Sequence, residues 1–279
     1  MVGIGISARR GYRNPYSALA SSYRWEAAAG LIAWFTLLVM LQAPAFAGEY
    51  RIGHCLHGCP QGASPENHLI LRPIYALSYN TTNKSADWVA YKISAGSIGI
   101  ATSLSRQPQP DNYVAETLSE ADFSSAEDAE LQRAQFVALV DFAGTPYWDD
   151  VNYLTNAVAR KRALNRGAWY GLEWSIRNLV NRGSDVFVLA GPVYKPTPQV
   201  SALRTRKSHR VPDAFFKIVI TERGQGSVFL FDQNTPVHVH HCELRSTLAE
   251  IEALTGLDFF PQNPWLVLDS LGSLVGCRE

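Results

Sequence analysis

The chain has 279 residues and carries equal numbers of basic and acidic side chains, 25 of each. With 47% hydrophobic and 18% charged residues, the composition excludes a disordered protein and predicts one large globular domain. The first 47 residues hold four Arg and one Glu, so the remainder has 21 basic and 24 acidic side chains, a net charge of −3. Nucleic-acid binding through overall positive charge is therefore excluded, and any such binding needs a local basic patch.

An uncharged, largely apolar segment runs from Ala27 to Gly48 and ends in Ala45-Phe46-Ala47, the small-x-small pattern of a signal-peptidase site. The arginines that precede this segment suit the positive side of an export signal. We expect residues 1–47 to be a signal peptide, with membrane anchorage through residues 28–47 as the alternative. The protein is then secreted or periplasmic, with a single domain over residues 48–279.

Four cysteines follow this segment, an even number in a chain that is predicted to be exported. Cys55 and Cys59 are close enough for a local disulfide loop, which leaves Cys242 to pair with Cys277. The competing interpretation is a zinc site in which His54 and His57 join the first two cysteines as ligands.

The pattern of apolar residues predicts an α+β domain built around an antiparallel sheet. The stretch ELQRAQFVALVDF (130–142) is interpreted as a buried strand, apolar over 136–140, with Gln132, Arg133 and Gln135 at its polar entrance. Two helices are expected, at 166–183 and 247–256, each followed or ended by Gly. The other expected strands are, in chain order, 74–80, 87–94, 185–194, 214–221 and 227–233.

Amide and cationic side chains gather immediately before the first predicted helix. Amide oxygens and cations at a helix N-terminus are suited to a hard metal ion together with phosphate. Inside the helix, Glu173 and Arg177 are four residues apart and project from one face; the alternative interpretation is a surface ion pair worth less than ~1 kcal/mol. The residues of the preceding run are Asn152, Asn156, Arg160, Lys161, Arg162, Asn165 and Arg166.

These segments resemble the Serratia-type DNA/RNA non-specific endonucleases, which are built on a ββα-metal finger. The resemblance covers about residues 55–277. It rests on many blocks in the same order, including CLHGCP, DWVAYKI, YWDDVNYLTN, LNRGAWYGLE, VFVLAGPVY, SHRVPDAFFKIVI and LFDQNTP. CLHGCP has the spacing of the family's small N-terminal disulfide loop.

The resemblance implies hydrolysis of DNA and RNA phosphodiesters with one Mg²⁺ ion. It implies that Asn165 is the protein ligand of the ion and that Glu173 orders metal-bound water. The arginine one turn later is Arg177, and Arg106 matches an arginine that stabilises negative charge on the phosphate. Relatives in the family are often dimers, so a homodimer is also expected.

The chain departs from the family at the position of the general base. QRAQ (132–135) stands where the family has Asp-Arg-Gly-His, so Arg133 is retained and Gln135 replaces the histidine. A neutral imidazole accepts a proton from the attacking water near neutral pH, whereas an amide has no basic lone pair. A second departure is Arg160, where many relatives have glutamine. The resemblance thus implies weak or altered hydrolysis, with a catalytically inactive protein that binds nucleic acid, or an interaction module for an envelope partner, as alternatives.

Two basic runs, residues 159–166 and 204–210, are candidates for a surface that contacts the nucleic-acid backbone without sequence preference. The residues expected to contact nucleic acid are Asn156, which precedes the first run, and Arg160, Lys161, Arg162 and Arg166 within it. The cluster His238, His240 and His241 offers two imidazoles on one side of an extended segment and is kept as an alternative zinc or copper site.

Overall fold

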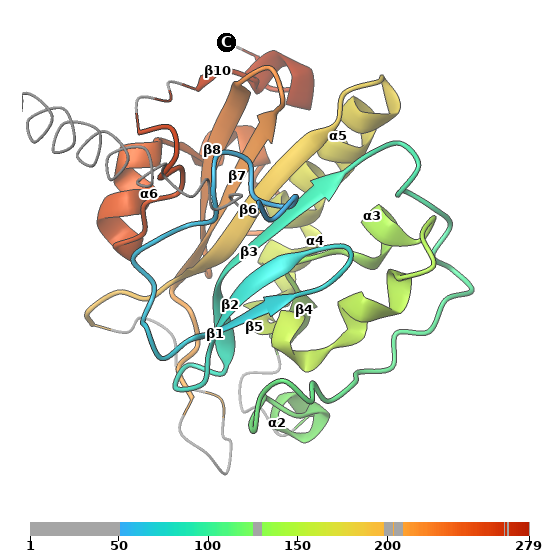
Figure 1. Cartoon of the computed structure of the whole chain (residues 1–279), viewed down its shortest axis with the longest axis vertical. Coiled ribbons are helices and arrows are strands. Elements are labelled where there is room, and N and C mark those ends of the chain that lie inside the picture. Colours follow the sequence, from blue (N-terminus) through green and yellow to red (C-terminus); the bar gives the residue numbers. More distant parts are fainter. Residues whose placement is uncertain are drawn as a thin grey trace, which may run out of the picture. The chain divides into compact units, whose positions relative to one another are not determined.

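An eight-stranded sheet lies at the centre of the described chain (Figure 1). The structure is a computed structural model that describes residues 51–124, 130–197, 203, 209–264, 266 and 268–278. The predicted signal or anchor segment lies outside these residues. Among the described helices, none has both the length and the apolar character needed to cross a bilayer.

The sheet is antiparallel except for one short pair at its end. Its strands are ordered β1 (His68–Leu71), β2 (Ala76–Asn80), β3 (Ser85–Ile93), β6 (Val186–Val193), β7 (Ala214–Thr221), β8 (Gln225–Asp232) and β10 (Asp269–Ser270), with β9 (Arg245–Ser246) also paired to β8. β10 runs parallel to β8. A separate two-stranded ribbon is formed by β4 (Leu131–Gln135) and β5 (Ala157–Lys161). The predicted antiparallel α+β fold is confirmed.

In the described part of the chain, all helices but one are short. They are α2 (Glu120–Ser124), α3 (Leu139–Phe142), α4 (Arg162–Arg166), α5 (Ala168–Asn181) and α6 (Leu248–Thr255), with 3-10 turns at Trp148–Asn152, Leu154–Asn156, His241–Leu244 and Gly272–Val275. α6 begins after Thr247, whose side chain accepts a hydrogen bond from the Glu250 amide, and ends at Gly256 with φ 72°. These are the start and stop signals that predicted it.

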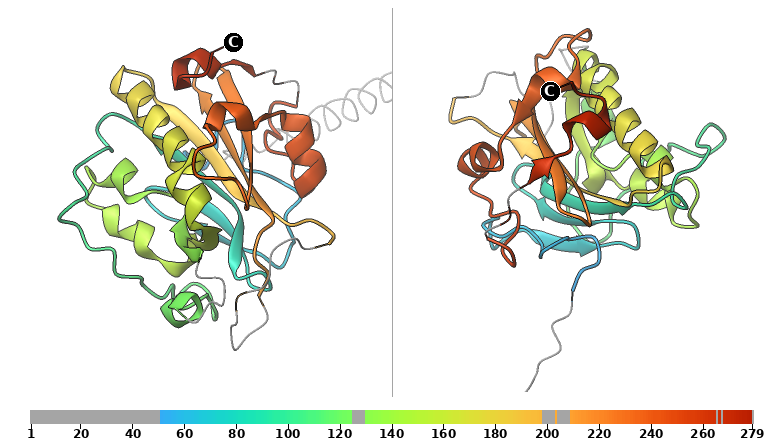
Figure 2. Two further views of the ribbon diagram at one scale, coloured as in Figure 1. Left: turned by 180° about the vertical axis from the view of Figure 1, so that it is seen from behind. Right: turned by 90° about the horizontal axis from the view of Figure 1, so that it is seen from above.

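Alternation along β7 divides the interior into two layers. Phe215 and Val219 belong to the cluster that packs against α5, whereas Phe216 and Ile218 belong to the cluster that contains Ile251 of α6. Figure 2 shows α5 and α6 on opposite faces of the sheet. Because side chains alternate along a strand, Lys217 faces the α5 layer with Phe215 and Val219.

The prediction of one strand over residues 130–142 is wrong in the extent of the strand. The strand β4 covers the polar half and ends at Gln135, while the apolar half continues into the short helix α3. The partner strand β5 starts only at Ala157, so the ladder has no strand beside Val137. The backbone N–H of Val137 instead donates to the Oδ1 of Asn156, at 3.0 Å. Pairing of backbone groups, rather than side-chain polarity, sets the end of the strand.

Both predicted disulfides are present, Cys55–Cys59 and Cys242–Cys277. The second joins the turn that starts at His241 to the end of the chain, and the Cys277 side chain is buried in the α5 layer. The first packs against the α6 layer. The zinc interpretation of Cys55 and Cys59 is therefore wrong, because a disulfide sulfur is not a thiolate ligand.

We expect the two disulfides to contribute unequally to stability. Replacing Cys242 and Cys277 by Ser removes a cross-link between residues 35 apart, which should lower the free energy of unfolding by about 4 kcal/mol on loop-closure entropy. The matched Cys55→Ser/Cys59→Ser variant opens a loop of separation 4 and should lose about 2 kcal/mol. Urea unfolding of both double variants beside the native chain measures the difference, and equal losses would contradict it.

Candidate active site on the finger

The ribbon β4–β5 and the helices α4 and α5 form a continuous ββα finger (Figure 1). In the ribbon Gln132 lies opposite Arg160, and Gln135 lies opposite Ala157. α4 starts directly after β5 and carries Asn165. Because the two strands are antiparallel, the end of β5 and the start of α4 lie beside Leu131 at the start of β4, and Gln135 lies at the other end of the ribbon.

A break at Gly167 separates Asn165 from the long helix, where one helix from 166 to 183 was predicted. The backbone at Gly167 has φ −92° and ψ −116°, outside the helical region. A Cβ at this position would lie 2.6 Å from the carbonyl oxygen of Val237 and 2.8 Å from that of Ala163. Glycine is needed here because two backbone segments approach too closely for any side chain.

Gln135 occupies the end of β4, and its amide is held in place. Its Nε2 donates to the carbonyl oxygen of Val151 at 2.8 Å. Its backbone carbonyl accepts a hydrogen bond from Nη1 of Arg160 at 3.3 Å. With the amide nitrogen bonded inside the protein, the amide oxygen is the remaining polar atom of the side chain. This oxygen can orient a water molecule but cannot take its proton.

Arg133, in the middle of β4, lies next to Arg106. Nη2 of Arg133 donates to the backbone carbonyl of Arg106 at 3.2 Å, and Nε of Arg133 is 3.0 Å from the Glu120 carboxylate. Arg106 itself is exposed, and its Nη1 donates to the carbonyl of Ala101 at 3.1 Å. The structure therefore brings together two arginines that are 27 residues apart in the sequence.

Asn165, the predicted metal ligand, is bonded to a cation of the protein itself. Its Oδ1 accepts a hydrogen bond from Nη1 of Arg160 at 2.9 Å. Two unit charges of like sign at 4 Å repel by about 4 kcal/mol in an effective dielectric constant of 20, and a divalent ion doubles that cost. The donor set, as placed, does not fit a divalent cation.

The other predicted helix residues are buried and have separate partners. Oε1 of Glu173 accepts from Nε1 of Trp169 at 2.6 Å and from Nζ of Lys217 at 3.2 Å. Nη1 of Arg177 donates to Oδ1 of Asp141 at 3.0 Å. Glu173 and Arg177 share a helix face as predicted, but they are not the surface ion pair of the alternative interpretation.

Burial shifts the pKa values of the charged side chains around Glu173. Loss of hydration, with the nearby Glu173 carboxylate, raises the pKa of Asp141 to about 6. Burial lowers the pKa of Lys217 to about 8 although Glu173 opposes the change, and it lowers the pKa of Arg160 to about 9. Arg160 therefore stays charged at neutral pH. These shifts arise because water no longer stabilises the charged forms.

Lys217 and Asp141 were not predicted from the sequence. Lys217 is fully buried, and Asp141 is 1% exposed. The sequence offered one signal for Lys217, its position inside the apolar run AFFKIVIT. A lysine is almost never fully buried without a partner, so a buried lysine there indicates a buried acidic partner. For Asp141 the partner is 36 residues away, and nothing local indicated it.

The predicted nucleic-acid contacts divide into buried and exposed residues. Asn156 is fully buried, and its amide bonds the backbone of Val137 and Val151. Arg160 is also fully buried. These two predictions are corrected, because neither side chain reaches the surface. Arg162 and Arg166 are exposed, whereas Lys161 is half-buried with its Nζ bonded to Oδ1 of Asn234 at 2.8 Å. Residues 204–208 of the second basic run lie outside the described residues.

The histidine cluster does not form the metal site that was kept as an alternative. Ligand atoms of His240, His241 and Cys242 lie within 4.8 Å of one another, and His238 is not among them. Cys242 is in a disulfide, so its sulfur is not available as a thiolate. Nδ1 of His240 accepts from the Cys242 amide at 3.3 Å, and Nε2 of His241 is 3.0 Å from the carbonyl of Val275. Both imidazoles thus have structural partners.

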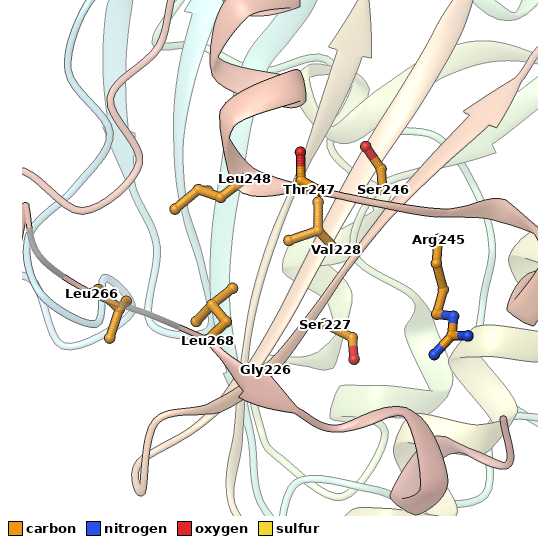
Figure 3. Close-up of a pocket in the computed structure, with 9 residues that line it drawn as sticks. All are labelled: Gly226, Ser227, Val228, Arg245, Ser246, Thr247, Leu248, Leu266 and Leu268. Atoms are coloured by element: carbon orange, nitrogen blue, oxygen red, sulfur yellow. The ribbon is translucent and has the colours of Figure 1, made fainter. Parts of the chain in front are cut away.

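A cavity of about 300 Å³ lies elsewhere in the chain, between β8, β9 and the start of α6 (Figure 3). Leu248, Leu266 and Leu268 line one side, and Arg245 is its only charged lining residue. None of the residues predicted for the active site lines it. It has no pair of groups for acid–base chemistry, so the finger remains the candidate active site.

Comparison with known proteins agrees with the geometry of the finger. The family model for DNA/RNA non-specific endonucleases matches residues 54–264. A nuclease of Serratia marcescens is 35% identical over 263 residues, covering 89% of this chain and 98% of the relative. A nuclease of Nostoc sp. is 28% identical and covers 74% of this chain and 80% of the relative.

The fold is also found in a solved structure. A chain in the crystal structure of an EndoG/EndoGI complex aligns with a TM-score of 0.60 at 21% identity, covering 74% of this chain and 89% of the other. At this identity the likeness concerns the fold alone. The match of the family model over residues 54–264 and the 35% identical Serratia relative show that the chain belongs to the DNA/RNA non-specific endonuclease family.

Proposed function

We propose that this protein binds DNA and RNA without sequence preference and hydrolyses them far more slowly than a family member with the histidine base. The observation that carries the proposal is Gln135 at the end of β4, where the resemblance places the base. Its amide nitrogen is bonded to Val151, so the side chain is held as a fixed hydrogen-bonding group.

The chemical consequence follows from proton transfer. Attack of water on a phosphodiester requires that a proton leaves the water, and general-base assistance is typically worth about 10²–10⁴-fold. The amide oxygen of Gln135 can accept a hydrogen bond from that water without accepting its proton. The site thus keeps groups that can bind and orient a phosphate but lacks the group that activates the nucleophile.

Binding is supported by the exposed cations on the finger. Arg162 and Arg166 are exposed on α4, and Arg106 is exposed beside Arg133 of β4. Cations that contact phosphates supply affinity without reading the sequence of the bases. Because the chain has no net charge, this local group must provide the attraction.

The second candidate is residual Mg²⁺-dependent hydrolysis. It is supported by the presence of Asn165, Glu173 and Arg177 in the finger at the positions that the resemblance assigns.

In both cases we propose that the protein acts outside the cytoplasm, either secreted or in the periplasm. Two disulfides and the apolar segment before Gly48 support export. A homodimer and anchorage through residues 28–47 stay predictions.

The native chain with Mg²⁺ and supercoiled plasmid should retard the plasmid on a gel and nick it only slowly. The variant Gln135→His/Arg160→Gln should nick at least ~10-fold faster than the native chain, since it restores a proton acceptor within the range that general bases supply. Adding Asn165→Ala to that variant should abolish the gain. Native nicking at the rate of the double variant would overturn the proposal in favour of the second candidate, and neither retardation nor nicking would favour an interaction module.

The exposed arginines should act on affinity rather than on stability. Arg162→Ala/Arg166→Ala should weaken binding equally for unrelated DNA sequences and reduce the salt dependence of log K by about 2, or roughly 0.9 per lost phosphate contact. Surface substitutions of this kind leave stability within about 0.5 kcal/mol. Fluorescence anisotropy at several salt concentrations measures the effect.

Asn156→Ala is the matched control for this assignment. It leaves buried backbone groups of Val137 and Val151 without the amide partner, so the free energy of unfolding should fall by about 2 to 3 kcal/mol. The folded fraction should keep the native salt dependence. If instead Asn156→Ala changed the salt dependence as much as the arginine variant, the division into buried and exposed residues would be incorrect.

A further inference from the structure

Arg160 is held in the interior of the finger by aromatic rings. It is fully buried, and its Cζ lies 3.6 Å from the centre of the Trp169 ring, 4.7 Å from Phe215 and 5.8 Å from Phe136. Aromatic faces carry negative charge density and attract cations, most strongly where water is excluded. The guanidinium is thus placed in a cage that suits a permanent positive charge.

The polar atoms of this guanidinium are mostly without protein partners. Nη1 donates to Oδ1 of Asn165 and to the carbonyl of Gln135, whereas Nε and Nη2 are buried with no hydrogen-bond partner in the described chain. Within the described residues no carboxylate lies at ion-pair distance from Arg160. The nearest carboxylate in the network, Glu173, is bonded to Lys217.

The charge of the cluster is therefore unbalanced. Glu173 pairs with Lys217, and Asp141 pairs with Arg177, so each carboxylate has its own cation. Arg160 adds one positive charge that neither carboxylate pairs with. Its Nη1 donates to Oδ1 of Asn165, the amide oxygen that the family resemblance assigns to a metal. A buried charge of this kind is expensive unless something of opposite charge compensates it.

We infer that the guanidinium of Arg160 is the resident cation of this site: it occupies the place at Asn165 that a divalent ion would need, and nucleic-acid binding requires no metal. The inference rests on the proposed function for its second half, since binding of nucleic acid is itself part of that proposal. The first half, exclusion of the ion, is a property of the free protein. Arg160 is a positioning residue here, because it holds the Asn165 amide and the Gln135 carbonyl.

Metal binding by the full chain tests the first half directly. Mn²⁺, a paramagnetic substitute for Mg²⁺, is titrated into the protein while electron paramagnetic resonance measures the free ion. The native chain should bind no ion at this site. Arg160→Gln should bind one Mn²⁺ at least about 10-fold more tightly than the native chain, within the range by which groups around a metal ligand alter affinity. Arg160→Gln/Asn165→Ala should lose that ion.

Arg162→Gln is the matched control, because it makes the same chemical change two residues further on at an exposed position. It should leave Mn²⁺ binding as in the native chain. Far-UV circular dichroism and thermal unfolding verify that each variant is folded. One tight Mn²⁺ ion in the native chain that Asn165→Ala removes would overturn the inference, as would an Arg160→Gln variant that folds and binds no ion.

The second half is tested on the native protein, so it does not depend on the folding of any variant. Retardation of DNA should be equal in EDTA and in Mg²⁺ at matched ionic strength. Binding that disappears in EDTA and returns with Mg²⁺ would overturn it. A native chain that binds neither DNA nor RNA would refute the proposed function, whereas the Mn²⁺ titration would still decide whether Arg160 excludes the ion.

Discussion

The burial of a cation between aromatic rings is the constraint on which the arrangement of the finger depends. Arg160 and Lys217 both contact the Trp169 ring, with Cζ of the first at 3.6 Å and Nζ of the second at 3.7 Å from its centre. Two cations on one ring repel each other, and Glu173 offsets that repulsion by accepting from both Trp169 and Lys217. The carboxylate is therefore first a structural counter-charge, because removing it would leave two buried positive charges unpaired.

The same network joins elements that are distant in the sequence. Lys217 comes from the central sheet, Glu173 and Trp169 from α5, and Arg160 from the ribbon. Arg177 connects α5 to α3 through Asp141. Hydrogen bonds between charged groups are stronger and more directional than neutral ones, so they fix the orientation of the finger on the sheet. Hydrophobic packing in the α5 layer alone would allow more sliding of the helix over the strands.

Much of the fold could be predicted from the sequence because the strands of the main sheet show their own patterns. AFFKIVIT and VFVLAGPV are strongly apolar, and α6 carries a Thr cap and a terminal Gly. The β4–β5 ribbon was harder to predict from the sequence. Residues 157–161 were interpreted by their charge, whereas in the structure they form a strand in which Arg160 points inward and Lys161 is bonded towards Asn234. Alternation along a strand separates the two, but it is informative only once the strand is known.

For the candidate site, the sequence predicted which residues take part but not how their side chains contact one another. The order of Gln135, Asn165, Glu173 and Arg177 along the chain could be assigned by resemblance, but the contact between Arg160 and Asn165 could not. Their separation of five residues fits neither a strand nor a helix pair, because it spans the end of β5 and the start of α4. The Arg160 side chain is longer and charged compared with the glutamine that the resemblance places there, and only the three-dimensional position of Trp169 shows where that charge is accommodated.

The two departures that the resemblance implies, at Gln135 and Arg160, are physically consistent with each other. A divalent ion in such a site contributes charge stabilisation and helps to form the nucleophile, and the second contribution requires a group that removes the proton. With Gln135 in place, only charge stabilisation remains useful, and a guanidinium held by the chain supplies positive charge without an ion. A permanent cation also needs no supply of metal, so the positive charge at the site is constant. Under the proposed function, the finger holds a polyanion and retains the nucleic acid rather than cleaving it.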